Sequence, residues 1–270
     1  MYLGIDVGGS KTLVAIFSHN GELKHEKKIP TPEKYPDFIK SLKLVLAEPD
    51  FEQTFDGCCC AMPGKIDRSQ GLVLEFGNEN WHNVPIKSDL EKLLPGCRVL
   101  VENDAKLAAV YEASELKDRY RKVAYITIST GIGAGFVQDG KLDPVLADGE
   151  VGFMLLPHNG KLEKWEDFAS GRALVKKYGK KAVDIDDPKI WQEYSADVAL
   201  GIDAILAVVQ PEVVVIGGGV GAHLEKFKPF LEAELKKFEN KLVHIPPILK
   251  AKKAEEAVIY GCYEYIKQSH

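Results

Sequence analysis

The sequence contains one arrangement twice: an apolar strand, a glycine-rich turn and a second apolar strand. The first copy occupies residues 2–18, with its turn at Gly8-Gly9-Ser10. The second copy occupies residues 122–138, with its turn from Ser129 to Gly133. Alternation of apolar with small or polar residues predicts half-buried strands. The two copies differ in their residues, so the repeat is one of architecture only. The combination of strands with helices along the chain predicts an α/β fold.

The remaining elements follow from apolar spacing. Further strands are expected at 23–29, 56–62, 72–76, 98–101 and 212–216, and a short helix capped by Ser88 runs to about Leu94. Positions three and four apart predict longer helices over 37–46, 105–116, 165–178, 190–209, 224–238 and 254–266. The strand-rich opening gives way to helices near residue 105, where we expect a domain boundary.

Bulk composition is typical of a soluble protein of one large domain or two small ones: 270 residues, 45% hydrophobic and 28% charged. The net charge of −5 makes nucleic acid and anionic membranes poor partners. A signal peptide needs a long apolar core, and Asp6 interrupts the apolar start of this sequence. A cytoplasmic location is therefore expected. The five cysteines include no CxxC pair, and Cys58-Cys59-Cys60 are expected to be buried in a strand, facing alternate sides.

A candidate acid or base stands where a strand gives way to a helix. The apolar run Val99 to Val101 ends in Glu102-Asn103-Asp104, and an alanine-rich helix follows. A carboxylate and an amide at the mouth of a strand occupy a common ligand position in α/β proteins. Asp104 is therefore the first candidate for a catalytic base.

Three glycine turns are candidates for phosphate binding. In the segment from Asp6 to Thr12, two glycines let backbone N–H groups converge on a phosphate. An aspartate facing a phosphate would repel it unless a cation lay between them, so Asp6 implies Mg²⁺. Ser129 to Gly135 offers a hydroxyl and further N–H groups, and Gly217-Gly218-Gly219 ends a strand before a helix. Each alone is equally compatible with a plain turn, and no GxxxxGK[ST] loop is present.

Taken together, these segments resemble the ROK family (repressor, open reading frame, kinase) of the hexokinase–actin–heat-shock ATPase superfamily, over nearly the whole chain. The resemblance rests on the first phosphate motif at residues 6–11, the PGxxD loop at 62–67, the NLxWxxVP stretch at 78–85, the ENDAN-type motif at 102–109, the second phosphate motif at 130–133 and the adenosine segment at 215–220.

The resemblance implies a two-lobed actin-like ATPase (ribonuclease H-like) fold of the α/β class with the active site in the interlobe cleft. The small lobe would comprise residues 1–105 together with the C-terminal helix, 254–270. The large lobe would comprise residues 106–253. Closure on a sugar and a homodimer are further expectations from the family.

The resemblance also assigns roles to individual residues. Asp104 would be the general base that takes the proton of the attacking sugar hydroxyl. Sugar-binding residues would be Gly64, Asn78, Asn103, Glu150 and Glu166, besides Asp104 itself. Phosphate or nucleotide would be bound at Asp6, Gly8, Gly9, Lys11, Thr12, Thr130, Gly131, Gly218 and Gly219, with Mg²⁺ held indirectly by Asp6.

The sequence departs from the family pattern at three places. Phe153 replaces a zinc-ligand histidine that also touches sugar in zinc-containing members, and residues 158–164 contain none of the usual zinc-ligand cysteines. No structural zinc is therefore expected, and His158 is interpreted as a loop histidine. Lys106 replaces the second asparagine of the ENDAN motif, at a position that faces either solvent or the cleft.

The leading functional hypothesis is ATP- and Mg²⁺-dependent phosphorylation of a hexose, glucose or a close relative. Alternatives are an N-acetylhexosamine kinase, such as one for N-acetylmannosamine or N-acetylglucosamine, and a polyphosphate-using glucokinase. A sugar-responsive repressor is disfavoured, because Asp6 is too close to the first residue to follow a DNA-binding module. A non-catalytic sugar sensor would not need Asp104 together with both phosphate turns.

Overall fold

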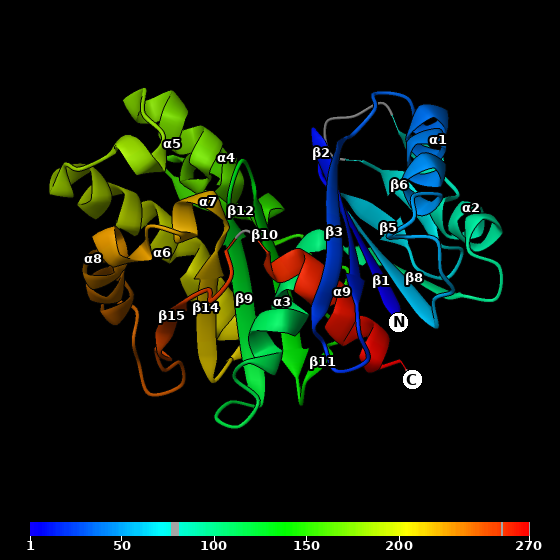
Figure 1. Ribbon diagram of the computed structural model, residues 1–270. Helices are drawn as coiled ribbons and strands as arrows, with labels where there is room; N and C mark the ends of the chain where they lie inside the picture. Colours follow the sequence, from blue (N-terminus) through cyan, green and yellow to red (C-terminus); the bar gives the residue numbers. More distant parts are fainter. Residues whose placement is uncertain (77–80, 255, 270) are drawn as a thin grey trace. The chain divides into compact units, whose positions relative to one another are not determined.

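The computed structural model describes residues 1–76, 81–254 and 256–269 (Figure 1). The chain divides into two compact units: Met1–Tyr111 with Glu256–His270, and Glu112–Glu255. The lobe boundaries expected from the sequence remain a prediction.

The first unit is built on a five-stranded sheet in the order β3-β2-β1-β4-β8. The strands β1, β2 and β3 run antiparallel, whereas β4 and β8 run parallel to β1. A small second sheet orders its strands β5-β6-β7. The strand bounds are β1 Tyr2–Val7, β2 Lys11–Phe17, β3 Leu23–Pro30, β4 Gly57–Met62, β5 Lys65–Asp67, β6 Leu72–Glu75, β7 His82–Val84 and β8 Arg98–Asn103.

Helices cover both faces of this sheet. On one face, α1 (Tyr35–Leu46) and α2 (Ile86–Leu93) bury Phe38 and Leu90 against strand side chains such as Ile5. On the other face, α3 (Asp104–Ser114) and α9 (Ala257–Lys267) pack against Cys59 and Ala61. The buried Cys58 and Cys60 belong to the first cluster and Cys59 to the second, as strand alternation predicts.

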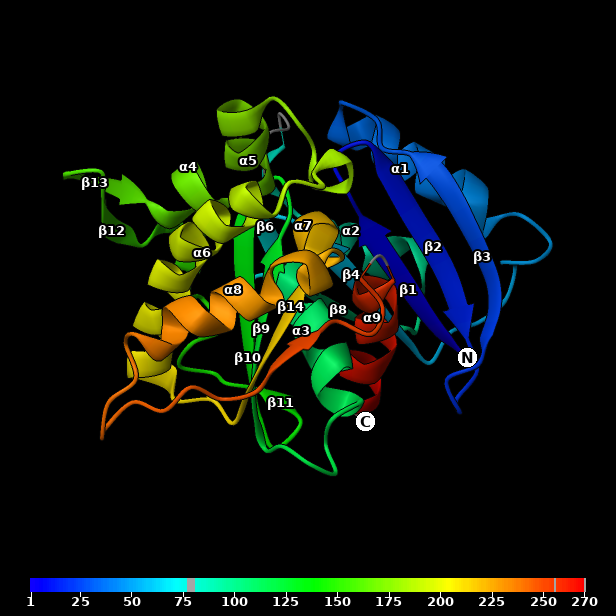
Figure 2. The same ribbon diagram turned by 90° about the vertical axis from the view of Figure 1, so that its left-hand side faces the viewer.

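The second unit has its own five-stranded sheet, in the order β11-β10-β9-β14-β15. The helices α6 and α8 pack against each other and bury residues such as Ile202 and Phe227 in one core with the sheet (Figure 2). The bounds are β9 Lys122–Ile128, β10 Ile132–Gln138, β11 Lys141–Leu142, β12 Leu155–His158, β13 Lys161–Lys164, β14 Val213–Gly217, β15 Ile248–Lys250, α4 Trp165–Ala169, α5 Gly171–Tyr178, α6 Pro188–Val209, α7 Gly218–Gly221 and α8 Leu224–Lys236, with short 3₁₀ turns η1 Val151–Phe153 and η2 Ala182–Asp184.

Two predicted helix boundaries are wrong. The expected helix over 165–178 is interrupted at Ser170, whose backbone is extended and whose Oγ accepts a hydrogen bond from the N–H of Ala173 at 3.2 Å. Ser170 therefore caps a separate helix, α5. Ser88 is no cap, because α2 begins at Ile86 and the Ser88 hydroxyl donates back to the carbonyl of Pro85 at 3.2 Å.

Among the residues that the structure describes, none lies in a helix with both the length and the apolar character needed to cross a bilayer.

Candidate functional site

Three chain reversals of the first unit meet at one edge of its sheet. The parallel register aligns Asp6 of β1 with Ala61 of β4, and Ala61 with Glu102 of β8. The carboxyl ends of these three strands therefore lie side by side, where α/β proteins commonly bind ligands. The turn after β1, the turn at Gly64 and the start of α3 at Asp104 follow directly from those ends.

Asp104 is the first residue of α3, and its Oδ1 accepts a hydrogen bond from the N–H of Ala105 at 2.7 Å. A carboxylate in the first turn of a helix is stabilised by the helix dipole and by exposed N–H groups. The preceding Asn103 is buried and has both ends of its amide engaged. Its Nδ2 donates to the carbonyl of Gly64 at 3.0 Å, and its Oδ1 accepts from the N–H of Lys106 at 3.3 Å. Two predicted sugar-site residues, Asn103 and Gly64, are thus directly linked.

Asp6 and Asp104 influence each other electrostatically. Burial, and secondarily the negative charge of Asp104, raise the pKa of Asp6 to about 7. Two carboxylates that disfavour each other's ionisation are relieved by a nearby cation. The donor set at this edge therefore fits Mg²⁺ bound through Asp6, directly or through water, when a phosphorylated nucleotide supplies further oxygen ligands.

The first glycine turn is held by hydrogen bonds from within the unit. The N–H of Gly8 donates to the carbonyl of Lys11 at 2.9 Å, and the hydroxyl of Thr31 donates to the carbonyl of Gly8 at 2.8 Å. Thr12 is fully buried, with its Oγ1 2.9 Å from the Oγ1 of Thr31. Thr12 thus braces the turn, whereas Gly9 and Lys11 are exposed.

Glu102 is an anchoring residue to which the sequence analysis gave no role of its own. Its carboxylate is 1% exposed and accepts hydrogen bonds from Nε and Nη2 of Arg68, both at 2.7 Å. The N–H of Asn103 also donates to Glu102, at 2.7 Å. This paired geometry is the strong form of an arginine–carboxylate contact. It fixes the chain immediately before Asp104.

Two further residues of the first unit were singled out in the sequence, Lys106 and Asn78. Lys106 is 2% exposed, so of the two orientations considered for it, solvent or cleft, the solvent-facing one is excluded. Asn78, predicted to bind sugar, lies outside the described residues.

In the second unit, two predicted glycine segments lie close together. Gly218 has φ +80°, and a Cβ there would lie 2.5 Å from the carbonyl oxygen of Ile128, so only glycine fits beside the strand that enters the second turn. The carbonyl of Ser129 accepts a hydrogen bond from the N–H of Gly171 at 2.7 Å. The second phosphate turn is thereby joined to the start of α5, and Gly219 is exposed beside it.

These segments line a pocket of about 400 Å³ that lies wholly within the second unit. It unites the predicted Thr130 and Gly219 with residues that sequence reasoning missed. Helix α5 supplies Arg172, and none of the motifs found in the sequence pointed to it or to the segment around η2. The lining residues are Ser129, Thr130, Gly171, Arg172, Val175, Lys181, Ala182, Val183, Gly219, Val220 and His223.

Glu166 lies in α4 against the second phosphate turn. A Cβ built on Gly131 would be 2.8 Å from Glu166 Oε2, and one on Gly152 would be 3.2 Å from the same oxygen. Glu166 Oε1 lies 3.6 Å from Nη2 of Arg172, which lines the pocket. The structure therefore places Glu166 next to Gly131, a predicted phosphate-binding residue.

Two other positions of this unit, Glu150 and Phe153, are more exposed than Glu166. Glu150 is exposed and directly precedes η1. Phe153 is 54% exposed, with Nζ of Lys164 4.3 Å from its ring centroid. His158 is not a loop residue, because it ends strand β12. Within residues 1–76, 81–254 and 256–269, no group of three or more His, Cys, Asp or Glu is arranged to hold a metal ion, and the expected absence of zinc stays a prediction.

The two sheets, each with a glycine turn at a strand end, form the actin-like ATPase fold of solved sugar kinases. A glucokinase from Streptomyces griseus, crystallised with glucose and AMPPNP, superimposes with a TM-score of 0.80 at 21% identity, covering 99% of each chain.

Sequence comparison gives the family. The profile of the ROK family matches residues 2–269, and the chain belongs to this family. It is 30% identical to an N-acetylmannosamine kinase of Salmonella typhi, covering 86% of this chain and 88% of the relative. It is 28% identical to an N-acetyl-D-glucosamine kinase of Vibrio atlanticus, covering 97% of this chain and 98% of the relative. The membership expected from the motifs is confirmed.

Proposed function

We propose that this ROK-family protein is a sugar kinase that transfers the γ-phosphoryl group of ATP to a hydroxyl of a hexose or N-acetylhexosamine. The observation that carries the proposal is the pair of carboxylates, Asp6 and Asp104, at the carboxyl ends of three parallel strands. A glycine turn follows the first carboxylate and a helix begins at the second. This combination offers a cation site and a proton acceptor at the same sheet edge.

Asp104 acts as the general base in this proposal. Its carboxylate accepts the proton of the sugar hydroxyl as the oxygen attacks the γ-phosphorus. The bond between that phosphorus and the bridging oxygen breaks, and ADP carries the electron pair away. Asn103 orients the site by fixing Gly64, and Gly64 presents its turn to the sugar. Positioning and charge neutralisation supply most of the catalysis in phosphoryl transfer.

Phosphate contacts are assigned to both glycine turns. In the first unit, Gly8, Gly9 and Lys11 offer backbone N–H groups and an exposed ammonium, and Asp6 holds Mg²⁺, which would neutralise phosphate charge. Thr12 contributes indirectly, by bracing the turn through Thr31. In the second unit, Thr130 and Gly131 are assigned to the phosphates.

The nucleoside is assigned to the pocket of the second unit. Val175, Val183 and Val220 offer apolar surface suited to the faces of a purine, while Arg172 and Lys181 add positive charge. Gly219 lines the pocket with open space where a side chain would stand, so backbone can approach the ligand there, and Gly218 is assigned to the nucleotide as the residue that lets the chain pack closely against Ile128. Arg172 lines this pocket and its Nη2 lies 3.6 Å from Oε1 of Glu166. The proposed nucleotide and sugar contacts of this unit are therefore adjacent.

The acceptor is assigned to Glu150 and Glu166 together with Gly64, Asn78 and Asn103. N-acetylhexosamines are the first candidates, because relatives that match nearly the whole chain are named as kinases of N-acetylglucosamine and N-acetylmannosamine. Glucose is the second candidate, as a glucokinase of the same fold binds it. A homodimer and a cytoplasmic location are proposed only on the family resemblance.

The test is sugar phosphorylation by the purified protein across glucose, mannose, N-acetylglucosamine and N-acetylmannosamine, with Mg-ATP as donor, followed by ADP release, and with polyphosphate as donor, followed by sugar phosphate formed. We expect at least one N-acetylhexosamine to stimulate ADP release well above the sugar-free rate. Preference for glucose would move the second candidate to first place. Transfer from polyphosphate but not from ATP would overturn the assignment of the nucleotide pocket, and no stimulation by any sugar or donor would overturn the kinase proposal.

A further inference from the structure

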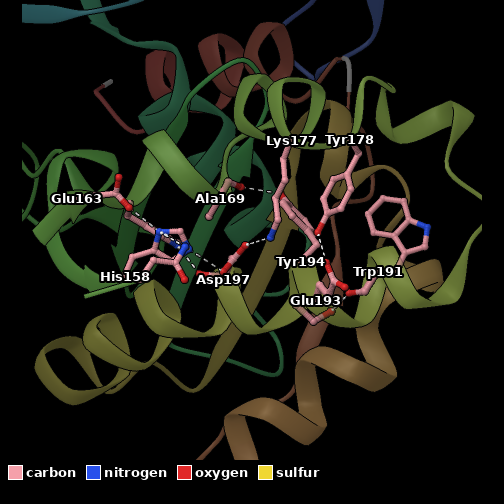
Figure 3. A network of polar contacts seen from close by, with 12 residues as sticks. His158, Glu163, Ala169, Lys177, Tyr178, Trp191, Glu193, Tyr194 and Asp197 are labelled. Atoms are coloured by element: carbon pink, nitrogen blue, oxygen red, sulfur yellow. Dashed lines mark hydrogen bonds and ion pairs between the residues drawn. The ribbon is translucent and has the colours of Figure 1, made fainter. Parts of the chain in front are cut away.

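His158 belongs to a network of polar contacts in the second unit, in which Asp197 lies between it and Lys177 (Figure 3). Its Nδ1 lies 2.6 Å from Oε2 of Glu163, across the β12–β13 hairpin. Its Nε2 lies 3.3 Å from Oδ1 of Asp197 in α6. The other oxygen of Asp197 accepts from Nζ of Lys177 in α5, also at 3.3 Å. One hairpin and two helices are thus joined through a single imidazole and a single carboxylate.

The same imidazole also contacts α4. Its ring stacks on Phe168 with the centroids 4.1 Å apart and the planes 9° from parallel. Phe168 lies two residues after Glu166 in a helix of only five residues, Trp165–Ala169. A helix this short gains little stability from its own hydrogen bonds, so its position depends on such outside contacts.

The first residue of α4, Trp165, is held by α6 and by the segment before β12. Nε1 of Trp165 donates to the backbone carbonyl of Asp197 at 3.3 Å, and the N–H of Trp165 donates to the carbonyl of Met154, just before β12, at 2.9 Å. Trp165 before Glu166 is therefore held by α6 and by Met154, and Phe168 after Glu166 is held by His158 of the β12–β13 hairpin. Glu166 itself points at Gly131 and Gly152, where less than a methyl group of space remains.

We propose that His158 is a positioning residue for Glu166: through Phe168, Glu163 and Asp197 it fixes α4, and thereby sets the carboxylate of Glu166 for the sugar. This inference rests on the proposed role of Glu166 as a sugar contact. His158 has a 15% exposed side chain and Asp197 a 12% exposed one, so their contact is well shielded from water. Lys177 contributes the positive charge that balances the carboxylate.

The test compares two substitutions that divide the contacts of the imidazole. His158→Phe keeps the stack on Phe168 but removes the polar contacts with Glu163 and Asp197. His158→Gln keeps one amide for hydrogen bonding but removes the stack. Lys161→Ala, an exposed position on the same hairpin, is the matched control. Sugar KM, ATP KM and hydrogen exchange of the amides in residues 165–169 are measured for each full-length protein.

We expect both His158 variants to raise the sugar KM by about tenfold, because small misplacements of a binding group carry large penalties. ATP KM should change less than about twofold, and exchange within α4 should accelerate, whereas Lys161→Ala should match the parent protein. Unchanged exchange in α4, or sugar and ATP KM rising together, would overturn the positioning role. A parent protein inactive on every sugar would refute the proposed function alone, because the exchange measurement still decides whether His158 fixes α4.

Discussion

Burial makes the carboxyl group of Asp6 an unusually weak acid. Burial, with a smaller contribution from Asp104, raises its pKa from an ordinary value of 3.8 to about 7. Between these two values the folded protein binds a proton at Asp6 that the unfolded chain does not. The contribution of Asp6 to the free energy of unfolding is therefore fully present below about pH 4, and it is lost as the pH rises to about 7.

Replacing Asp6 by asparagine removes this ionisation. We expect the Asp6→Asn protein without ligands to be more stable than the parent at pH 8, by a few kcal/mol at most, and to differ little at pH 4. Thermal unfolding across this pH range measures the difference, with Asp118→Asn, an exposed carboxylate, as the control. A difference that stays constant with pH would show that burial does not set the charge of Asp6. Kinase activity should be lost at every pH, since Asp6 is proposed to hold Mg²⁺.

Motifs located most of the candidate residues but could not give their surroundings. Thr12 belongs to a recognisable phosphate segment, yet its hydroxyl is buried against Thr31, on a loop far along the chain. Lys106 could be assigned to the first turn of a helix, but its burial depends on packing between distant segments. The proximity of Asp6 and Asp104 likewise depends on strand order, which apolar spacing does not encode.

At the scale of elements, the contact between α9 and α3 is unusually close. A Cβ on Gly261 would lie 2.0 Å from the carbonyl oxygen of Leu107, whereas one on Gly4 of β1 would meet the end of the Ile259 side chain at 2.9 Å. Backbone cannot rotate away from such a contact as a side chain can. The glycine at position 261 is therefore needed for the C-terminal helix to seat on the first unit.

We expect Gly261→Ala to destabilise the protein by about 1–3 kcal/mol, the usual range for overpacking a buried contact. Chemical denaturation measures the effect, and Lys267→Ala, at an exposed position of the same helix, should change stability little. Full stability in Gly261→Ala would show that α9 can shift away from α3 without loss.

The repeating strand–turn–strand units were predictable because their apolar alternation is long and regular. The β12–β13 hairpin was missed, although Asn159-Gly160 at its turn is a strong hairpin signal, and both residues have positive φ. Its strands are only four residues long, and their alternation is correspondingly weak. The break between α4 and α5 was missed because apolar spacing continues through Ser170, and only the hydrogen bond of its hydroxyl reveals a cap.

At the scale of the whole molecule, the family could be predicted from the order of its motifs, and the match over residues 2–269 confirms it. The acceptor sugar could not, because it depends on a few side chains, and the position of Phe153 departs from the family pattern. The residues proposed for the base and Mg²⁺ belong to one unit, and those proposed for the nucleoside belong to the other.

The most direct test of the central claim is the rate of sugar-dependent ADP release by Asp104→Asn, using the best acceptor found in the sugar panel. Asparagine matches aspartate in shape, and its amide oxygen can still accept the hydrogen bond from Ala105 that Asp104 accepts at 2.7 Å. We expect kcat to fall by about 10²- to 10⁴-fold, the usual contribution of a general base, while sugar and ATP KM stay close to those of the parent protein. A variant that folds normally and keeps a near-parental kcat would contradict the assignment of Asp104 as the base.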